Sequence, residues 1–383
     1  MRLWPLFIFW CLWYLNYSTR TVFAPLLPLI EDHLALSHGQ AGGLLTTLSI
    51  GFCISLITAG RFAPVWGYKR TVVGGLIGIG VVVLLLQGAE SYVGLHCMSF
   101  LAGIALGGYI PSIIPIITEA YEPRHWGKAI GLHDTAAGFA LFTTPIFVAF
   151  GLHFFSWRRL LLFLGVAAIL LPIYFWKIAV EPKKPPPQEK GHYKALLKEK
   201  TVWVVGFLWI VSNGSCNGIY SILPLYLVKE QGIDFDYANT LIGISRFGGI
   251  FASVVSGFLA DRFGYRKILM LSILVTGLST TALAFLHPLP LLVFILIFQG
   301  VVSLAFFPLA LAALSRLTPP SERAMATGIA IAFGVVFGAG CTPLVLGAIA
   351  DHFSFQVGIL GVGMITTLSS LLVGFLKETR DAK

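Results

Sequence analysis

Apolar runs of about 20 residues recur along the whole chain between short polar breaks, and they constrain the fold more than any other feature. A helix of about 20 residues crosses a hydrocarbon core of roughly 30 Å, whereas membrane-spanning strands are about ten residues long and alternate in polarity. The runs do not alternate. With 57% hydrophobic and 11% charged residues, the sequence predicts an all-α membrane protein. Twelve transmembrane helices are expected, at 4–30, 40–62, 71–88, 92–118, 128–152, 159–179, 202–228, 238–260, 268–286, 290–315, 325–349 and 355–376.

The positive charge is distributed unevenly between the polar segments. If the N-terminus is cytoplasmic, 21 of the 26 Lys and Arg lie in cytoplasmic segments, and only Arg158, Arg159 and Lys229 lie outside. This bias follows the positive-inside rule, so the net charge of +9 reflects topology and we expect no nucleic-acid partner. The sequence predicts a multi-pass protein of a prokaryotic cytoplasmic (inner) membrane, with both termini in the cytoplasm.

The longest polar break, residues 181–201, divides the spans into six and six. Shifting the chain by 197 residues aligns Gly60 with Gly257 and Gly67 with Gly264. Six is an even number, so both copies enter the membrane in the same direction, as in transporters with parallel repeats and a midplane site. We expect two six-helix halves, 1–180 and 202–383, joined by a cytoplasmic linker at 181–201 around a central cavity.

The repeated loop carries the most specific motif. Its second copy, "GFLADRFGYRK", resembles the G-x-x-x-D-R-x-G-R-[KR] signature of the major facilitator superfamily (MFS), and the resemblance in span number, repeat and linker covers essentially the whole chain. It implies the MFS fold and a cytoplasmic gate, although the cations alone could simply follow the positive-inside rule. The gating candidates are Gly257, Asp261, Arg262, Gly264, Arg266 and Lys267, with Gly60, Gly67, Lys69 and Arg70 in the first copy.

The first copy, "GRFAPVWGYKR", has Pro64 where the aspartate belongs. A carboxylate latch cannot operate there, so either the halves are gated unequally or Arg61 and the backbone make the contact.

Arg20 and Arg246 lie inside apolar spans at similar expected depth. A charge at a helix centre costs on the order of 2.5 to 3.5 kcal/mol. None of the 17 Asp and Glu is expected at that depth, and the nearest is Asp134. Arg20 could reach the membrane surface with its long side chain. Otherwise the natural partner of both guanidinium groups is an anion, which they can bind bidentately.

A narrower resemblance also indicates an anionic substrate. "LNYSTRTVFAPLLPLIEDHLALSHGQAG" is similar to the first span of the organic-anion branch of the superfamily, which includes anion:cation symporters, and this implies that Arg20 binds substrate. An arginine in span eight, here Arg246, is similar to that of monocarboxylate and oxalate carriers. Thr19 stands where those symporters usually have an aspartate implicated in proton coupling, so the coupling ion stays open, with protons as one candidate.

Further polar residues are candidates for the cavity, although each could equally serve helix packing. These substrate-binding candidates are Asn16, Tyr17, Tyr109, Asn213, Asn217, Tyr220 and Gln299. His133 and Asp134 form an adjacent titratable pair within a span. They could couple protons, or pair at the cytoplasmic end with Arg124, Lys128 or the Asp261 loop.

The leading hypothesis is a secondary active transporter that moves a small organic anion by alternating access, with the two arginines binding the anionic group. The alternative is a multidrug or metabolite efflux antiporter, although "GFALFTTPIF" replaces the G-x-x-x-G-P pattern of proton antiporters in span five. An enzyme is not expected, since no HExxH, GxSxG or P-loop motif occurs. The five cysteines lie within spans without CxxC spacing, so we expect no metal site and no cofactor, in a monomer embedded in the bilayer.

Overall fold

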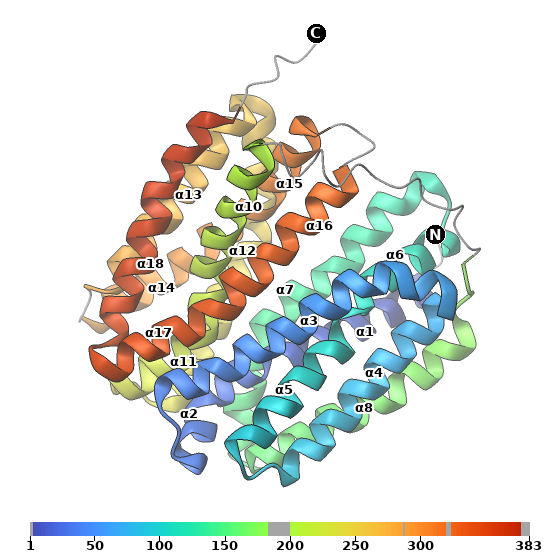
Figure 1. The fold of residues 1–383 in the computed structure, drawn as a ribbon, viewed down its shortest axis with the longest axis horizontal. Helices are drawn as coiled ribbons and strands as arrows, with labels where there is room; N and C mark the ends of the chain where they lie inside the picture. The colour runs from blue at the N-terminus through green and yellow to red at the C-terminus, as the bar shows by residue number, and fades with distance from the viewer. Residues whose placement is uncertain (1–2, 183–199, 286–287, 319–322, 377–383) are drawn as a thin grey trace.

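A computed structural model describes residues 3–182, 200–285, 288–318 and 323–376, and within these ranges the regular structure is entirely helical (Figure 1). The linker expected at 181–201 lies almost entirely outside the described residues. The helices of the first part are α1 Leu3–Thr21, α2 Phe23–Leu34, α3 His38–Trp66, α4 Tyr68–Leu85, η1 Leu86–Gly88, α5 Tyr92–Gly107, α6 Tyr109–Ala120, η2 Pro123–His125, α7 Trp126–Leu152 and α8 Trp157–Ile178. Those of the second part are α10 Lys200–Asn213, η3 Gly214–Gly218, α11 Ile219–Leu225, η4 Tyr226–Glu230, α12 Phe235–Phe263, α13 Tyr265–Leu283, α14 Leu289–Ser303, α15 Phe306–Leu317, α16 Arg323–Phe333, η5 Gly334–Gly340, α17 Cys341–His352, α18 Phe355–Ser369 and η6 Ser370–Phe375.

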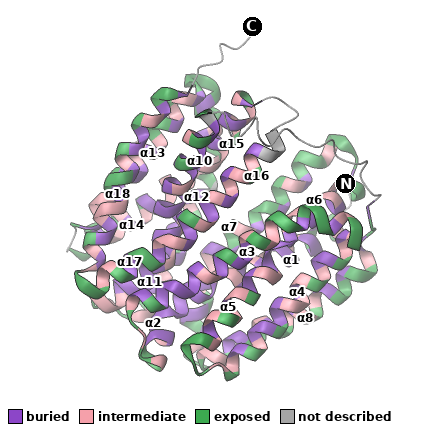
Figure 2. Ribbon diagram, viewed as in Figure 1, coloured by how far each residue is buried: buried purple, intermediate pink, exposed green. Residues whose placement is uncertain are grey.

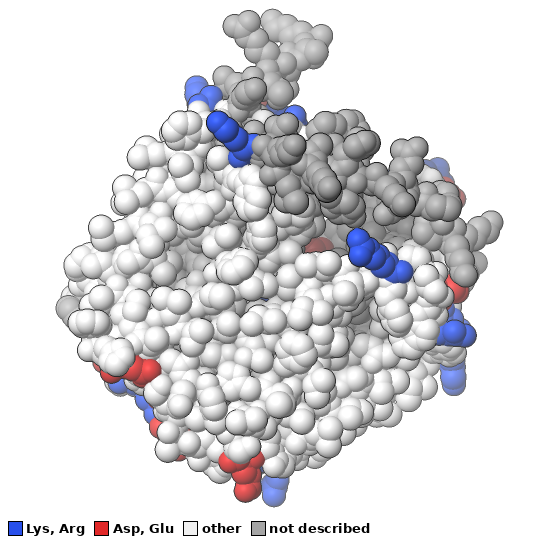
Figure 3. Space-filling model, viewed as in Figure 1, with Lys and Arg blue, Asp and Glu red and all other residues white. Residues whose placement is uncertain are grey.

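The described helices confirm the all-α membrane fold. Eleven of them, some built from two to four consecutive elements, are long and apolar enough to cross a membrane, and α1 followed by α2 forms the other expected span. Large apolar side chains are exposed on the outer helix faces while the centre is buried (Figure 2). In the view of Figure 3, charged atoms gather near the two ends of the molecule and leave an uncharged band between them. Such a band suits contact with lipid.

The internal repeat is visible in the helix boundaries. α3, α4, α5, α6 and α7 each begin 197 residues before α12, α13, α14, α15 and α16, respectively. This is the register in which the sequence aligns with itself. The two copies therefore share breaks as well as spans: the fourth span of each is interrupted in its middle, near Gly108 and near Ala305.

The first span is broken beside Arg20. Pro25 lacks the backbone N–H that would bond to the carbonyl of Thr21, and its ring crowds that carbonyl, so the helix cannot run on unchanged. Thr19 and Thr21 also donate their hydroxyls to the carbonyls of Leu15 (2.8 Å) and Tyr17 (2.9 Å), a bond that bends helices. α1 consequently ends at Thr21, and Arg20 lies in its last turn, in mid-span.

The N-terminal helices α1–α8 and the C-terminal helices α10–α18 meet chiefly where α3 packs against α17 and η5, α7 against α12, and α2 against α11. We call the end of the molecule with Leu3 and the Trp66–Tyr68 loop the termini face, and the end with residues 34–38 and 352–355 the far face.

The far face is closed. Asp351 at the end of α17 accepts hydrogen bonds from the Ser37 hydroxyl (2.8 Å) and from the backbone N–H groups of His38 (2.8 Å) and Gly39 (3.0 Å), so it caps α3 from the other half. Lys229 pairs with Asp32 across the same face. These bonds hold α2 and α3 against α17 and the end of span seven.

The glycines of the far face permit this closure. A Cβ atom at Gly42 would lie 2.3 Å from the Pro343 carbonyl oxygen, and one at Gly347 would lie 2.2 Å from that of His38. At the termini face, by contrast, a Cβ at Gly60 or Gly257 would meet nothing within 4 Å. In the described part of the chain, the halves therefore touch on the far face and leave open space around these glycines on the termini face.

Candidate functional site

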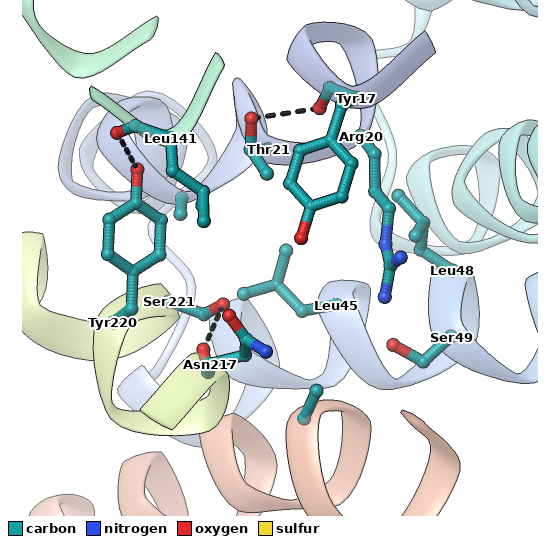
Figure 4. A pocket seen from close by; sticks show the side chains of 12 residues that line it. Tyr17, Arg20, Thr21, Leu45, Leu48, Ser49, Leu141, Asn217, Tyr220 and Ser221 are labelled. Carbon is teal, nitrogen blue, oxygen red and sulfur yellow. Dashed lines mark hydrogen bonds between the residues drawn. The ribbon is translucent and has the colours of Figure 1, made fainter. Parts of the chain in front are cut away.

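A cavity of about 50 Å³ lies between the two groups of helices (Figure 4). A water molecule needs roughly 10 to 15 Å³ of such space, so the cavity has room for several water molecules. Its walls come from α1, α2, α3 and α7 on one side and from η3, α11 and η5 on the other. The lining residues are Tyr17, Arg20, Thr21, Ala24, Leu45, Leu48, Ser49, Leu141, Asn217, Tyr220, Ser221 and Ala339.

Arg20 lines this cavity and is half-buried. Its guanidinium carbon lies 4.3 Å from the ring centroid of Phe52 and 5.8 Å from that of Tyr17. Aromatic faces attract a cation, but they do not provide the oxygen acceptors that its N–H groups need for ordinary hydrogen bonds. Among the described residues, no carbonyl, hydroxyl or carboxylate accepts a hydrogen bond from Arg20, and none forms an ion pair with it. Its hydrogen-bonding capacity therefore remains open towards the cavity.

Arg246 lies one side chain behind the cavity wall. It is 1% exposed, and its guanidinium carbon is 4.6 Å from the ring centroid of Tyr220, which lines the cavity. It donates through Nη2 to the Cys216 carbonyl (3.1 Å) and through Nη1 to Ser303 Oγ (3.5 Å). Its Nε has no partner among the described residues, and no described carboxylate pairs with it. It is a buried positive charge without a counter-ion.

The two arginines occupy related positions in the repeat. Aligning span one with span seven places Arg20 opposite Cys216, and the 197-residue register places Arg246 opposite Ser49. In the structure Arg246 bonds to Cys216, and Arg20 shares the cavity wall with Ser49. Each half thus carries one arginine between its first two spans, contributed by a different helix in each.

The other cavity-lining candidates are Tyr17, Asn217 and Tyr220, and the Tyr17 hydroxyl points into the space between the labelled side chains (Figure 4). Sequence reasoning did not single out Thr21, Ser49 or Ser221 as lining residues. Ser49 had a signal, because it is the repeat partner of Arg246. Thr21 and Ser221 had none, since a hydroxyl within a span is equally common in helix packing.

Four candidates lie away from the cavity and bond within the helix bundle. Asn16 donates to the Leu106 carbonyl (3.4 Å), and Asn213 accepts from Asn217 Nδ2 (2.7 Å). Tyr109 donates to the Phe9 carbonyl (3.1 Å). Gln299 donates to the Ser215 carbonyl (2.8 Å). In this conformation these four side chains stabilise helix contacts.

His133 and Asp134 on α7 differ in exposure. His133 is 1% exposed, stacks on the rings of Trp13 and Tyr109, and lies 3.2 Å from the Tyr109 hydroxyl. Because that hydroxyl donates to Phe9, His133 Nε2 is the donor in this contact. Asp134 is exposed, and neither residue lines the cavity of Arg20. Their coupling role stays a prediction.

The two loops predicted to form the gate make their contacts within their own group of helices. Gly67 (φ 115°) and Gly264 (φ 91°) join consecutive helices with a backbone that side-chain-bearing residues rarely adopt. Asp261 and Arg262 are exposed, and Asp261 makes no hydrogen bond or ion pair among the described residues. Arg266 donates to the Val373 carbonyl (3.2 Å).

In the first copy of the loop, Lys69 lies over the Trp176 ring (4.7 Å) and Arg70 donates to the Trp66 carbonyl (3.4 Å). In the second copy, Lys267 is exposed. Arg61, the residue expected to take over the contact of the missing aspartate, is exposed and makes no hydrogen bond or ion pair among the described residues. Glu181 accepts from the backbone N–H groups of Tyr68 (2.6 Å) and Lys69 (3.0 Å), so it caps α4 within the same half.

Residues 9–252 and 210–383 match the model of the Major Facilitator Superfamily. The chain is 26% identical over 365 residues to a gentisate transporter of Corynebacterium glutamicum, covering 89% of this chain and 80% of that protein. It is 25% identical over 375 residues to a 3-(3-hydroxy-phenyl)propionate transporter of Escherichia coli (92% and 88% covered). It is 23% identical to a hexuronate transporter of Bacillus subtilis, where the match spans 66% of this chain and 63% of that protein.

Solved transporter structures share the fold at low sequence identity. A bacterial homologue of the human lysosomal transporter Spinster, in an inward-facing and occupied conformation, superimposes with a TM-score of 0.84 at 15% identity, with 98% of this chain and 97% of that chain covered. The D-xylose-proton symporter gives a TM-score of 0.80 at 15% identity, with 99% of each chain covered.

Proposed function

Since the chain belongs to the major facilitator superfamily, we propose that it is a secondary transporter that carries a small organic anion across the membrane by alternating access. Relatives named as transporters of gentisate, 3-(3-hydroxy-phenyl)propionate and hexuronate support the substrate class, since all three names denote carboxylates. Family membership and these relatives point to transport and not to an enzyme.

The observation that carries the proposal is the open guanidinium group of Arg20. It lies in mid-span, half-buried, against a cavity between the two groups of helices, and no described residue neutralises it. An unpaired charge in a membrane span is expensive and marks a functional site by default. A carboxylate would supply two acceptors in one plane, which matches the guanidinium fork.

In this proposal Arg246 contributes its positive charge to anion binding from behind the cavity wall. Its two Nη groups donate to Cys216 and Ser303 and its side chain does not line the cavity, so its charge acts on the cavity through Tyr220 and not by direct contact in this conformation. Two positive charges around one small space raise the affinity for an anion more than either would alone, because the surroundings have a low dielectric constant.

Alternating access fits the arrangement of the helices. The far face is held closed by bonds such as those from Ser37 and His38 to Asp351, and the termini face leaves space around Gly60 and Gly257. We infer that residues 1–180 and 202–383 rock as two units around the cavity. Opening the far face requires these bonds to break and bonds at the termini face to form. The carboxylate of Asp261, which has no partner in the described part of the chain, is a candidate for such a bond.

A thermal-shift screen of the purified protein against organic acids and inorganic anions tests the proposal. At least one carboxylate should raise the unfolding temperature of the wild type. Arg20→Ala should lose this stabilisation, and Arg124→Ala should keep it, because Arg124 is paired with Glu122 on the exposed surface. If the acid stabilises Arg20→Ala as much as wild type, the site is elsewhere. Stabilisation by lipophilic cations alone would favour the efflux antiporter.

A further inference from the structure

A groove of about 310 Å³ lies near the termini face, between α3, α4 and the fourth span, and shares no lining residue with the cavity of Arg20. All of its lining residues belong to the N-terminal helices, and Figure 1 shows α3, α4 and α5 at the near surface of the bundle. The groove therefore lies on the outside of these helices. Apart from three hydroxyls its lining is small or apolar: Ser55, Thr58, Ala59, Phe62, Trp66, Thr71, Gly74, Gly75, Ile104, Ala105 and Gly108.

The glycines of α4 shape this groove. A Cβ atom at Gly75 would lie 2.6 Å from the Ala105 carbonyl oxygen, so a glycine is needed for α4 to approach the fourth span this closely. A Cβ at Gly74 would lie 3.1 Å from the Trp66 ring, so any side chain there would enter the space beside that ring. Phe62 and Trp66 form an aromatic rim, with ring centroids 5.1 Å apart. A hydrocarbon chain suits such a lining, because each CH₂ group that it buries is favourable.

A positive charge without a partner lies beside the groove. An adjoining hollow of about 420 Å³ shares Thr58 and Phe62 with the groove and is also lined by Arg61. Its other lining residues are Ile57 and Val65, so the hollow contains a guanidinium group and no carboxylate. Arg61 is exposed, and its side chain makes no hydrogen bond or ion pair in the described part of the chain.

The internal repeat shows that the shared scaffold does not require this charge. In the 197-residue register, Arg61 aligns with Phe258 and Pro64 aligns with Asp261. Residues three apart on a helix are neighbours. The second copy therefore has a carboxylate one turn from an apolar side chain, whereas the first copy has a cation one turn from a proline.

The other side of the groove is positive as well. Lys69 and Arg70 line a third hollow, of about 440 Å³, which shares Trp66 with the groove. Glu181 is the one carboxylate among its lining residues, and it already accepts hydrogen bonds from the backbone N–H groups of Tyr68 and Lys69. An anion at this corner would thus be attracted by three cations, and the single carboxylate is engaged in capping α4.

We propose that the groove binds a phospholipid with a net negative charge, with its phosphate at Arg61 and an acyl chain beside Trp66. The bilayer supplies this occupant, because the rim faces outwards, with Phe62 52% and Trp66 43% exposed. The termini face is predicted to be cytoplasmic, and anionic lipids of that leaflet attract Lys and Arg. In the first copy of the loop, the lipid supplies the negative charge that Asp261 supplies in the second. The site is separate from the substrate cavity and does not rest on the proposed function.

Quenching of tryptophan fluorescence tests the proposal on the full-length protein in mixed micelles. Phosphatidylglycerol and phosphatidylcholine with brominated acyl chains are titrated separately, and the contribution of Trp66 is the difference between the wild type and Trp66→Phe. Half-maximal quenching of this contribution should need about fivefold less phosphatidylglycerol than phosphatidylcholine, a factor that corresponds to about 1 kcal/mol for one cation.

Two variants separate the phosphate from the chain. Arg61→Gln should abolish the preference for phosphatidylglycerol. Gly74→Leu, which places a side chain in the groove, should weaken both lipids alike. Arg159→Gln is the matched control and should keep the wild-type preference, because Arg159 is an exposed arginine at the opposite end of the molecule whose side chain has no hydrogen bond or ion pair among the described residues.

Three results would overturn the proposal. The first is equal affinity of the wild type for the two lipids, and the second is a preference for phosphatidylglycerol that survives in Arg61→Gln. The third is displacement of the brominated lipid by an equal concentration of glycerol 3-phosphate, because it would show that the headgroup binds without the groove.

Discussion

The crossing of α3 over α17 at Gly42 provides a sharp test of how the far face is closed. A Cβ atom at Gly42 would lie 2.3 Å from the Pro343 carbonyl oxygen, whereas ordinary contacts begin at 3.4 Å. Gly42→Ala must therefore push the two helices apart by about 1 Å, and overpacking of this kind costs about 1 to 3 kcal/mol. The cost applies only while the far face is closed.

The helical preference of alanine over glycine, about 1 kcal/mol, acts in both conformations and cancels between them. A penalty of 1 to 3 kcal/mol should shift the population towards opening of the far face by about 5- to 150-fold. The reporter is a Thr21→Cys substitution in a background without the native cysteines, because Thr21 lines the cavity. Its rate of labelling by a membrane-impermeant maleimide, added on the far-face side, should rise by up to that factor.

Gly43→Ala is the matched control on the same helix, because a Cβ there meets only side-chain atoms at ordinary contact distance, the nearest at 3.4 Å. It should leave the labelling rate close to that of the parent protein. Equal labelling of the Gly42→Ala and Gly43→Ala proteins would refute the reasoning, since it would mean that the crossing at Gly42 does not hold the far face closed.

Three further substitutions test other parts of the account. Arg246→Met should raise the thermal stability, because it removes a buried charge without a counter-ion, and should lower anion affinity; a drop in stability with unchanged affinity would make Arg246 purely structural. Asp351→Asn removes the charge from hydrogen bonds to the start of α3, each of which contributes about 1.5 to 3 kcal/mol. The labelling rate of the same Thr21→Cys reporter from the far face should therefore rise. An unchanged rate would show that Asp351 does not hold the far face closed. Glu181→Gln should lower the unfolding free energy by about 0.5 to 2 kcal/mol in thermal or denaturant melts, as the loss of a helix cap does, and no change would show that the cap contributes nothing.

The span pattern, the repeat register and the helical fold could be predicted from the sequence because hydrophobic length and periodicity determine them. The register was accurate to the residue for five pairs of helix starts. The breaks in the helices within the spans could not be predicted as well from the sequence. The break after Thr21 depends on Pro25 and two threonines acting together. The π-helical segment Gly214–Gly218 packs against η5, a contact between distant parts of the chain that no local pattern reveals.

The candidate site could be predicted only in part. Arg20 stood out because a charge in a span is rare, and Tyr17 and Asn217 were near it in sequence or by the repeat. Gln299 and Tyr109 looked equally suitable, yet they bond to backbone carbonyls away from the cavity. Helical periodicity does not reveal which face of a wholly apolar helix turns towards the other half, so it could not separate these groups.

Transport by reconstituted protein tests the central claim most directly, namely that Arg20 binds the anion being carried. The acid that stabilises the wild type should enter proteoliposomes through the wild-type protein and through Arg124→Lys. Arg20→Lys keeps the charge but loses the planar fork, so its KM should rise at least tenfold, about 1.4 kcal/mol, while its unfolding temperature without substrate stays near that of the wild type. An Arg20→Lys protein that transports the same acid with an unchanged KM would contradict the account.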